Sequence, residues 1–165
     1  MKIIYQNWTI LIFLLSLIAV SSALIAEIIF NLAPCKMCLY QRNPYYFIIG
    51  IILFFYFLKK IESIWLYLFI EIAILYGIFY SAWHVGIEQN IFKGPSGCSS
   101  ILNEASSTKD LKDQILNQDI ISCSEISWTM LGLSAATINL ILMIFFIYFN
   151  TIYIYRKLYG QEKKI

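Results

Sequence analysis

Four long runs of apolar residues constrain what this chain can fold into. The runs cover about residues 8–30, 44–58, 64–82 and 130–149. About 20 consecutive apolar residues cross the hydrocarbon core of a bilayer as a helix, and Arg42 and Lys59 can extend the shorter second run by reaching to the interfaces. None of the runs alternates between polar and apolar residues as barrel strands do. The runs therefore predict four transmembrane helices.

The composition requires a lipid environment for this chain. Of its 165 residues, 60% are hydrophobic and only 13% are charged. A soluble domain of this length has no interior large enough to bury so much apolar surface. We therefore predict a single all-α integral-membrane domain over residues 1–165, a four-helix transmembrane bundle with external loops at about 31–43 and 83–129. The sequence has no basic stripe and no Gly-rich phosphate loop, so no nucleic acid is expected as a partner.

The first apolar run has one alternative interpretation. Lys2, the Leu/Ile-rich run and the small residues at about 19–26 are also typical of a cleaved signal peptide. The run is longer than the apolar region of a typical signal peptide, so we expect it to remain as a membrane anchor.

Positive charge gathers on one side of the predicted bundle. The two ends of the chain and the tight connection at 59–63 carry seven of the twelve lysines and arginines: Lys2, Lys59, Lys60, Arg156, Lys157, Lys163 and Lys164. Segments rich in Lys and Arg remain in the cytoplasm. Both termini are therefore predicted to be cytoplasmic, and the loops at 31–43 and 83–129 to lie on the opposite side.

All four cysteines lie on the predicted external loops. Cys35 and Cys38 belong to the first loop, and Cys98 and Cys123 belong to the second. Cysteines that face away from cytosolic reductants are typical of disulfides in an oxidising compartment, so the sequence predicts two pairs. Closing Cys98 to Cys123 would remove loop entropy worth roughly 3–4 kcal/mol, and this second pair can be structural or redox-active.

Cys35 and Cys38 form a C-x-x-C pair, whose two thiols can alternate as attacking and leaving group in disulfide exchange. Haem attachment is excluded because a leucine follows the second cysteine. A zinc site needs two further ligands, which Cys98, Cys123 and His84 supply only if the two loops fold together. A structural staple stays open, although so small a ring constrains little chain. We favour a redox role and expect no bound metal.

Charge next to the pair favours a reactive thiolate. Arg42 follows Cys38 by four residues, and Asn43 is placed to cap a helix that begins at Pro44. A guanidinium within about 5 Å, at an effective dielectric constant of about 20, would lower a thiol pKa by about 2 units. The alternative for Arg42 is an interfacial side chain that holds phospholipid headgroups.

The segment PCKMCLYQR resembles the signature of the DsbB family, the membrane thiol:quinone oxidoreductases of the bacterial inner membrane. The resemblance continues in YSAWHVGIEQ, in GPSGCSS and in CSEISWTMLGLSAATINL, and covers about residues 8–149 with the cysteines in the family's order. It implies a multi-pass inner-membrane oxidoreductase that generates disulfides, with its cysteine loops in the periplasm.

The resemblance also implies a role for each cysteine. The Cys35–Cys38 pair would be reoxidised by a membrane quinone, either ubiquinone or menaquinone. The Cys98–Cys123 pair would oxidise a DsbA-like periplasmic thiol oxidase, with Cys98 taking the mixed disulfide. Cys35 and Cys123 would form an interloop disulfide that passes oxidation between the pairs. Cys38 would face the quinone as a thiolate beside Arg42.

Three further predictions depend on where the helices end. His84, expected at the start of the second external loop, is either a quinone-site residue or a structural interfacial histidine, and Glu88 shares its face if the helix continues that far. Glu71 should face the bundle interior, be neutral or hydrogen-bonded, and carry protons only as the less favoured alternative. Residues 108–116 are expected to form a short amphipathic helix.

A non-enzymatic function is the competing hypothesis. In that case the chain is a four-span membrane protein whose external loops are merely cross-linked by structural disulfides. It would form no mixed disulfide with any periplasmic protein, and its disulfides would resist mild reductants.

Overall fold

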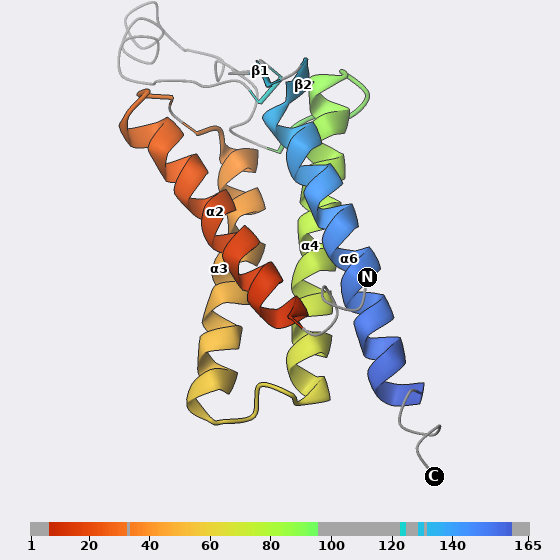
Figure 1. Cartoon of the computed structure of the whole chain (residues 1–165). Coiled ribbons are helices and arrows are strands. Elements are labelled where there is room, and N and C mark those ends of the chain that lie inside the picture. The colour runs from red at the N-terminus through yellow and green to blue at the C-terminus, as the bar shows by residue number, and fades with distance from the viewer. Residues whose placement is uncertain (1–6, 33, 96–122, 125–128, 131, 160–165) are drawn as a thin grey trace, which may run out of the picture.

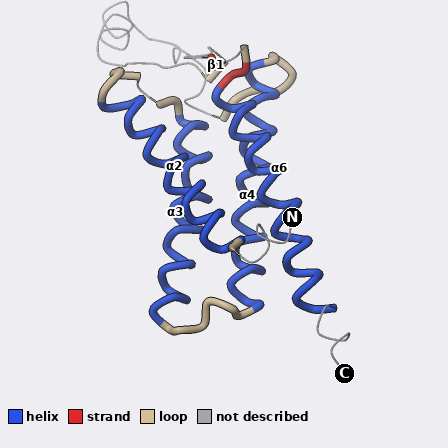
Figure 2. The backbone as a smooth tube through the Cα atoms, viewed as in Figure 1, coloured by secondary structure: helices blue, strands red, loops and turns tan. Residues whose placement is uncertain are grey.

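The computed structural model describes residues 7–32, 34–95, 123–124, 129–130 and 132–159. These residues form four long helices and a short antiparallel strand pair: α2 (Trp8–Ile28), α3 (Lys36–Phe57), α4 (Ile64–Glu88), β1 (Thr129–Met130), β2 (Leu133–Ser134) and α6 (Ala135–Tyr159). Helices α3 and α4 run antiparallel from a short turn at one end of the bundle (Figures 1 and 2). The prediction of four helices is confirmed in the described residues, and the prediction that all four cross the membrane stays a prediction. The predicted helix at 108–116 and Cys98 lie outside the described residues.

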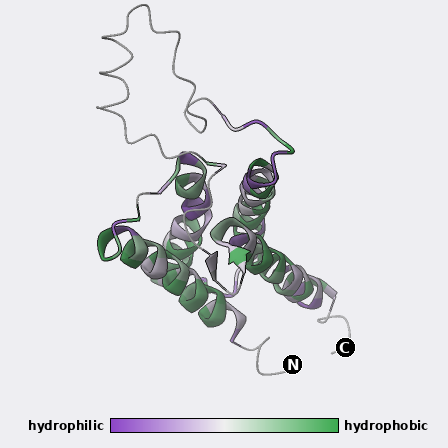
Figure 3. Cartoon of the chain, turned by 90° about the horizontal axis from the view of Figure 1, so that it is seen from above, coloured by the Kyte–Doolittle hydropathy of each residue, from purple (hydrophilic) through white to green (hydrophobic). Residues whose placement is uncertain are grey.

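The outer surface of the bundle is apolar. Ile18, Ile72 and Phe57, from three different helices, are 62%, 63% and 79% exposed, and hydrophobic residues cover much of the helix surfaces in Figure 3. Large apolar side chains so widely exposed require hydrocarbon rather than water around them. By length and composition, α2, α4 and α6 can each cross a membrane. The chain is therefore a multi-pass membrane protein.

Helix α3 begins two turns before the predicted position. Its N-cap is Cys35, whose Sγ accepts a hydrogen bond from the Cys38 backbone N–H, so the expectation that Asn43 caps this helix is wrong. The physical reason is that proline is tolerated inside a helix when tertiary packing supports the kinked backbone, and Pro44 is buried here. The early turns of α3 contain Gln41 and other polar residues, so α3 is less apolar than α2, α4 and α6.

Helices α3, α4 and α6 meet in close contact at Gly77. A Cβ on Gly77 would lie 2.7 Å from Met143 Sδ and 3.1 Å from Pro44 Cγ. Glycine therefore provides the space in which the proline ring of α3 and the methionine of α6 pack against α4. Around this point lies the apolar core, which includes Ile12, Ile48, Ile52, Leu66, Ile70, Ile74 and Phe146.

A polar cluster joins α2, α4 and α6 in the other half of the bundle. Trp8 Nε1 donates to Asn150 Oδ1 at 3.1 Å, and Asn150 Nδ2 donates to the Glu71 carboxylate and to the Tyr67 carbonyl. Thr151 Oγ1 also donates to Glu71, at 2.7 Å. The prediction that Glu71 is hydrogen-bonded is confirmed. Trp8 and Asn150 are fully buried, so this cluster holds three helices together from inside.

A side-chain hydrogen bond joins the end of α4 to the residue before α6. Helix α4 continues to Glu88, past the predicted span end at 82, so His84 lies in a helix and the expectation of a loop there is wrong. A tight strand pair replaces the first residues of the predicted fourth span, with Gly132 at φ +79°. Ser134 Oγ accepts from the Thr137 backbone N–H and donates to Glu88 Oε2 at 2.5 Å.

Candidate redox site

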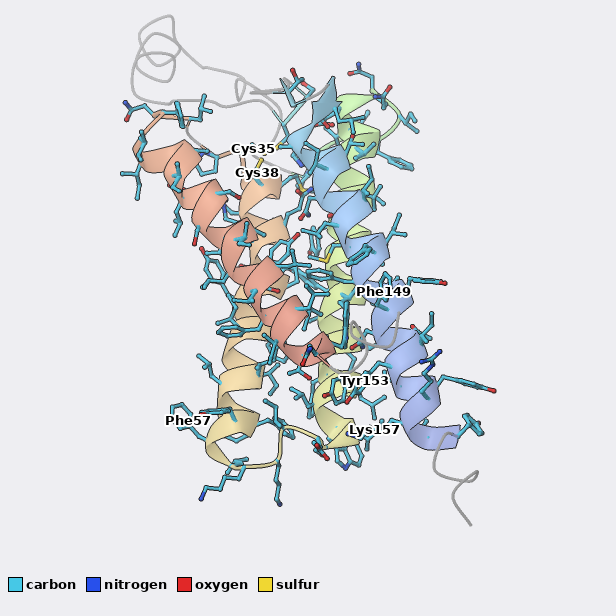
Figure 4. All side chains as sticks on the ribbon, in the orientation of Figure 1. Cys35, Cys38, Phe57, Phe149, Tyr153 and Lys157 are labelled. Carbon is cyan, nitrogen blue, oxygen red and sulfur yellow. The ribbon has the colours of Figure 1, made fainter. Side chains whose placement is uncertain are left out.

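Two free thiols lie together at the first turn of α3 (Figure 4). Cys35 Sγ and Cys38 Sγ are 2.7 Å apart, and Cys35 is only 5% exposed. Because Cys35 is the N-cap, its sulfur also faces the positive end of the helix dipole and a backbone N–H. Helix geometry therefore brings the two sulfurs together and favours a negative charge on Cys35.

His84 approaches the same sulfur from α4. Its Nε2 lies 3.6 Å from Cys35 Sγ, and its Nδ1 lies 3.0 Å from Gln41 Nε2. An amide nitrogen can only donate, so Nδ1 of the neutral ring accepts and the proton is on Nε2. His84, which is 4% exposed, therefore donates its Nε2–H toward Cys35.

The orientation of Gln41 is fixed in turn by α6. Asn139 Nδ2 donates to Gln41 Oε1 at 3.4 Å and to Ser81 Oγ at 2.7 Å, and the Tyr45 hydroxyl donates to Asn139 Oδ1. The donors run in one direction, from Tyr45 through Asn139, Gln41 and His84 to Cys35. Such a chain, with its groups mutually satisfied, holds the histidine in one tautomer.

These contacts make Cys35 acidic. The pKa of its thiol is lowered from 9.0 to about 5, chiefly because the Cys38 thiol donates a hydrogen bond to its sulfur. His84 lowers the pKa further through the hydrogen bond that its Nε2–H donates, while burial opposes the shift. At neutral pH Cys35 is therefore the thiolate of the pair and Cys38 keeps the shared proton, whereas the family resemblance implied the thiolate on Cys38.

Arg42 is paired with a carboxylate of α2. Its Nη1 lies 2.6 Å from Glu27 Oε2, and its Nη2 donates to the Ala23 carbonyl at 3.4 Å. The arginine side chain is 13% exposed and that of Glu27 is 37% exposed. Part of the guanidinium charge is thus neutralised by Glu27, so the Cys35 thiolate is favoured by Cys38 and His84 more than by the arginine.

A cavity of about 300 Å³ opens beside the thiols, between α2, α3 and α6. Figure 1 shows α2 and α6 separating toward this end of the bundle. Cys38, Gln41, Arg42, Tyr45 and Asn139 line the polar part of the cavity. Small and apolar residues line the rest: Leu15, Ile18, Ala19, Ser22, Ala23, Ala26, Leu32, Pro34, Ala135, Ile138 and Leu142. Cavities of this kind, mostly apolar with a few converging polar groups, bind small molecules.

Cys123 lies in the same buried cluster as Cys35. The cluster also contains Met37 and Ile87, and Cys123 is 1% exposed. Cys123 is disulfide-bonded, whereas Cys35 and Cys38 are free. The structure therefore brings three of the four predicted redox cysteines to one end of the bundle.

The sequence predicted most residues of this site individually and missed the groups that connect them. Cys35, Cys38 and His84 converge, whereas Arg42 lines the adjoining cavity and pairs with Glu27. Asn139 was not identified, and neither was Gln41. The signal available for Asn139 was a polar amide inside an apolar run, because polar residues in transmembrane helices usually face a functional interior.

The fold and the site define a class, the multi-pass membrane proteins with a reactive thiol pair at one end of a helix bundle. The family model described as disulfide bond formation protein DsbB matches residues 5–153. The chain belongs to the DsbB family, and is a membrane protein of disulfide-bond formation with the disulfide oxidoreductase activity of that family.

The chain is also similar to a protein of Rickettsia prowazekii (strain Madrid E) described as the uncharacterized protein RP370. The two sequences are 33% identical over 142 residues, which cover 85% of this chain and 82% of that protein. No solved structure was found to match the chain.

Proposed function

We propose that this protein reoxidises a soluble DsbA-like thiol oxidase and passes the two electrons to a membrane quinone. The observation that carries the proposal is the cavity of about 300 Å³, which has the Cys38 side chain on its wall and lies between helices of an apolar bundle. A lipid-soluble acceptor reaches such a cavity from the bilayer. We further propose that α3 is the fourth span and that the site lies at the periplasmic face of the bacterial inner membrane.

The residues of the cavity fit a quinone ring. Its apolar walls suit the ring and the start of an isoprenoid tail, and Arg42 and Tyr45 are polar groups that α3 contributes to the lining together with Cys38. A bound quinone would supply a two-electron acceptor. In the overall reaction, the Cys35–Cys38 dithiol loses two electrons and two protons as its S–S bond forms, and the quinone becomes a quinol. His84 and Gln41 hold the negative charge on Cys35 before that step.

Exchange between the two cysteine pairs is supported by the shared burial of Cys35 and Cys123. Once the partner has reduced the second pair, the Cys123 thiolate attacks Cys35 in the Cys35–Cys38 disulfide. The S–S bond breaks, and Cys38 leaves as a thiolate. Cys98 then attacks Cys123 and releases Cys35, which regenerates the disulfide of the second pair.

A turnover assay tests the proposed reaction. The purified protein, given a reduced DsbA-like partner, should reduce a soluble quinone analogue. The loss of quinone absorbance measures the rate. Cys38→Ser should lower turnover to the uncatalysed rate, because no disulfide can form at the first pair. Leu39→Ala, a neighbour on the exposed side of the helix, should leave it unchanged. Normal turnover in Cys38→Ser would contradict the proposal.

A trapping experiment separates the enzyme from the non-enzymatic alternative. In Cys123→Ser, the Cys98 thiolate attacks the disulfide of the oxidised partner and forms a mixed disulfide, which no thiol at position 123 is present to resolve. It should therefore accumulate as a larger species on a non-reducing gel and disappear on reduction. A protein whose loops are merely cross-linked would give no such species.

Substitution of Arg42 tests whether the quinone binds in the cavity. If its guanidinium donates to a quinone oxygen, Arg42→Ala should raise the quinone concentration at half-maximal rate by about tenfold or more, because a hydrogen bond from a charged donor is worth about 1.5–3 kcal/mol. Thiol exchange with the partner should continue at the normal rate. Arg42→Lys, which retains the charge, should lose less. An unchanged quinone dependence in Arg42→Ala would place the quinone elsewhere.

A further inference from the structure

We propose that Cys35, Cys38 and His84 together bind a thiophilic divalent cation of the Zn²⁺ class, and only while the thiol pair is reduced. Their three ligand atoms, two sulfurs and one imidazole nitrogen, all lie within 4.8 Å of one another. The site is independent of the electron acceptor, because it requires only the dithiol and the histidine.

The distances are close to those of a tetrahedral zinc centre. Zn–S bonds of about 2.3 Å and Zn–N bonds of about 2.0 Å place two sulfurs about 3.8 Å apart and a sulfur and a nitrogen about 3.5 Å apart. Cys35 Sγ and His84 Nε2 are already 3.6 Å apart. The two sulfurs, at 2.7 Å, must separate by about 1.1 Å, which a rotation of the Cys38 side chain about its Cα–Cβ bond allows.

The ligand set also suits the burial of the site. Cys35 and His84 are 5% and 4% exposed, so an uncompensated charge would be unfavourable there. Two thiolates neutralise the two positive charges of Zn²⁺, and the imidazole binds as a neutral ligand. The one proton that the two sulfurs share is released on binding, and no electron is transferred. Three protein ligands leave one tetrahedral position for water or an added thiol.

Gln41 can support the metal-bound histidine. To bind a metal through Nε2, the ring must carry its proton on Nδ1, which lies 3.0 Å from the Gln41 amide. Asn139 donates to this amide in the metal-free state, so the two amides must rotate together: the Gln41 oxygen then accepts the Nδ1–H, and the Asn139 oxygen accepts from the Gln41 N–H. Metal-bound histidines regularly donate their second N–H to such an oxygen. One glutamine therefore supports the metal-free and the metal-bound tautomer in turn.

The redox state of the pair decides whether the site exists. A Cys35–Cys38 disulfide uses both sulfurs in one bond and leaves no thiolate to bind the cation. Conversely, a bound cation holds both thiolates and prevents their oxidation. Cys123 does not complete the site in this state, because it is buried in the same cluster but disulfide-bonded. Zinc and disulfide should therefore be mutually exclusive at this position.

A metal titration tests the proposal. Purified full-length protein with Cys98 and Cys123 replaced by serine carries only the first pair, and is reduced and freed of reductant under argon. Zn²⁺ alone is titrated against a chromophoric chelator, and Co²⁺ serves as an optical probe whose charge-transfer bands report thiolate ligation. The reduced protein should bind one Zn²⁺ per chain. The same sample after oxidation of its remaining pair should bind none.

Substitutions identify the third ligand. His84→Ala should weaken Zn²⁺ binding by about 100-fold or more, since even loss of an outer-shell partner weakens metal sites by about 10–100-fold. Tyr80→Phe, one turn away on α4 and without a ligand atom in the site, should bind normally. Equal binding by reduced and oxidised protein, no binding by either, or unchanged affinity in His84→Ala would each overturn the proposal. The comparison of redox states needs no substitution at the site, so it decides the question even if His84→Ala fails to fold.

Discussion

A single shared proton distinguishes Cys35 from Cys38 at the residue scale. The two thiols are equivalent in the sequence, but only Cys35 caps the helix and faces His84. Hydrogen bonds to the charged form lower a pKa, whereas burial alone raises that of a thiol. The lowered pKa of Cys35 shows that the hydrogen bonds outweigh its burial.

The alkylation rate of Cys35 should therefore depend on pH with a midpoint near the pKa of about 5, in the presence of a chelator. A lowered pKa means that the reactive thiolate is present above this pH and is lost as the pH falls through it. His84→Ala should raise the midpoint by about 1–2 pH units, because a hydrogen bond to a charged group is worth about 1.5–3 kcal/mol. Mass spectrometry of the alkylated peptide measures the rate.

Tyr76→Phe, on the exposed face of α4, serves as the control and should leave the midpoint unchanged. A midpoint near 9 in the unmodified protein, the ordinary value of a cysteine thiol, would contradict the assignment of the thiolate to Cys35.

At the scale of the helices, close packing at Gly77 determines how the site residues of three helices lie relative to one another. Gly77 lets the Pro44 ring of α3 and Met143 of α6 approach α4. The same three helices carry Cys38, His84 and Asn139 one to two turns further toward the end of the bundle that holds the thiols. A change of spacing at Gly77 is therefore expected to affect both the stability of the bundle and the geometry of the hydrogen-bond chain.

Gly77→Ala should destabilise the protein by about 1–3 kcal/mol, because the added methyl group overlaps Met143 and the rigid Pro44 ring. Gly50→Ala is the matched control, since a Cβ on Gly50 meets nothing within 4 Å. Both substitutions replace a helical glycine with a better helix former, so their difference isolates the packing effect. Thermal unfolding in detergent measures it, and equal melting temperatures would contradict the proposed close contact.

At the scale of the whole molecule, the position of α3 decides the topology. Its 22 residues span about 33 Å, which is enough to cross the hydrocarbon core, although its first turns are polar. If α3 crosses, the turn between α3 and α4 lies opposite the cysteines. The start of α2 and the end of α6 then lie on the same side as that turn (Figure 1).

Labelling with a membrane-impermeant maleimide tests this topology. In a background with the native cysteines replaced by serine, Asn31→Cys and Ile91→Cys should be labelled in intact spheroplasts. Lys60→Cys, in the turn after α3, should be labelled only in inside-out vesicles. Labelling of Asn31→Cys and Lys60→Cys from the same side would show that α3 does not cross the membrane.

The sequence by itself determined the membrane environment, the four helices and the thiol pair. Apolar runs and the C-x-x-C spacing are local properties of the sequence. An apolar run needs lipid around it whatever the distant residues are, and two sulfurs one helical turn apart lie close together for the same reason. This is why residues 8–28, 64–82 and 135–149 were correctly predicted as helix. The start of α3 was missed because a buried proline inside a helix depends on its tertiary neighbours.

Only the tertiary structure decided which groups control the thiols. His84 meets Cys35 across 49 positions, and Asn139 meets Gln41 across 98. Such contacts depend on the rotation and relative height of each helix, which are set by packing at points such as Gly77. An apolar run shows that a helix crosses lipid, but not which of its faces meets a neighbour. The pairing of Arg42 with Glu27 and the acidity of Cys35 follow from that packing.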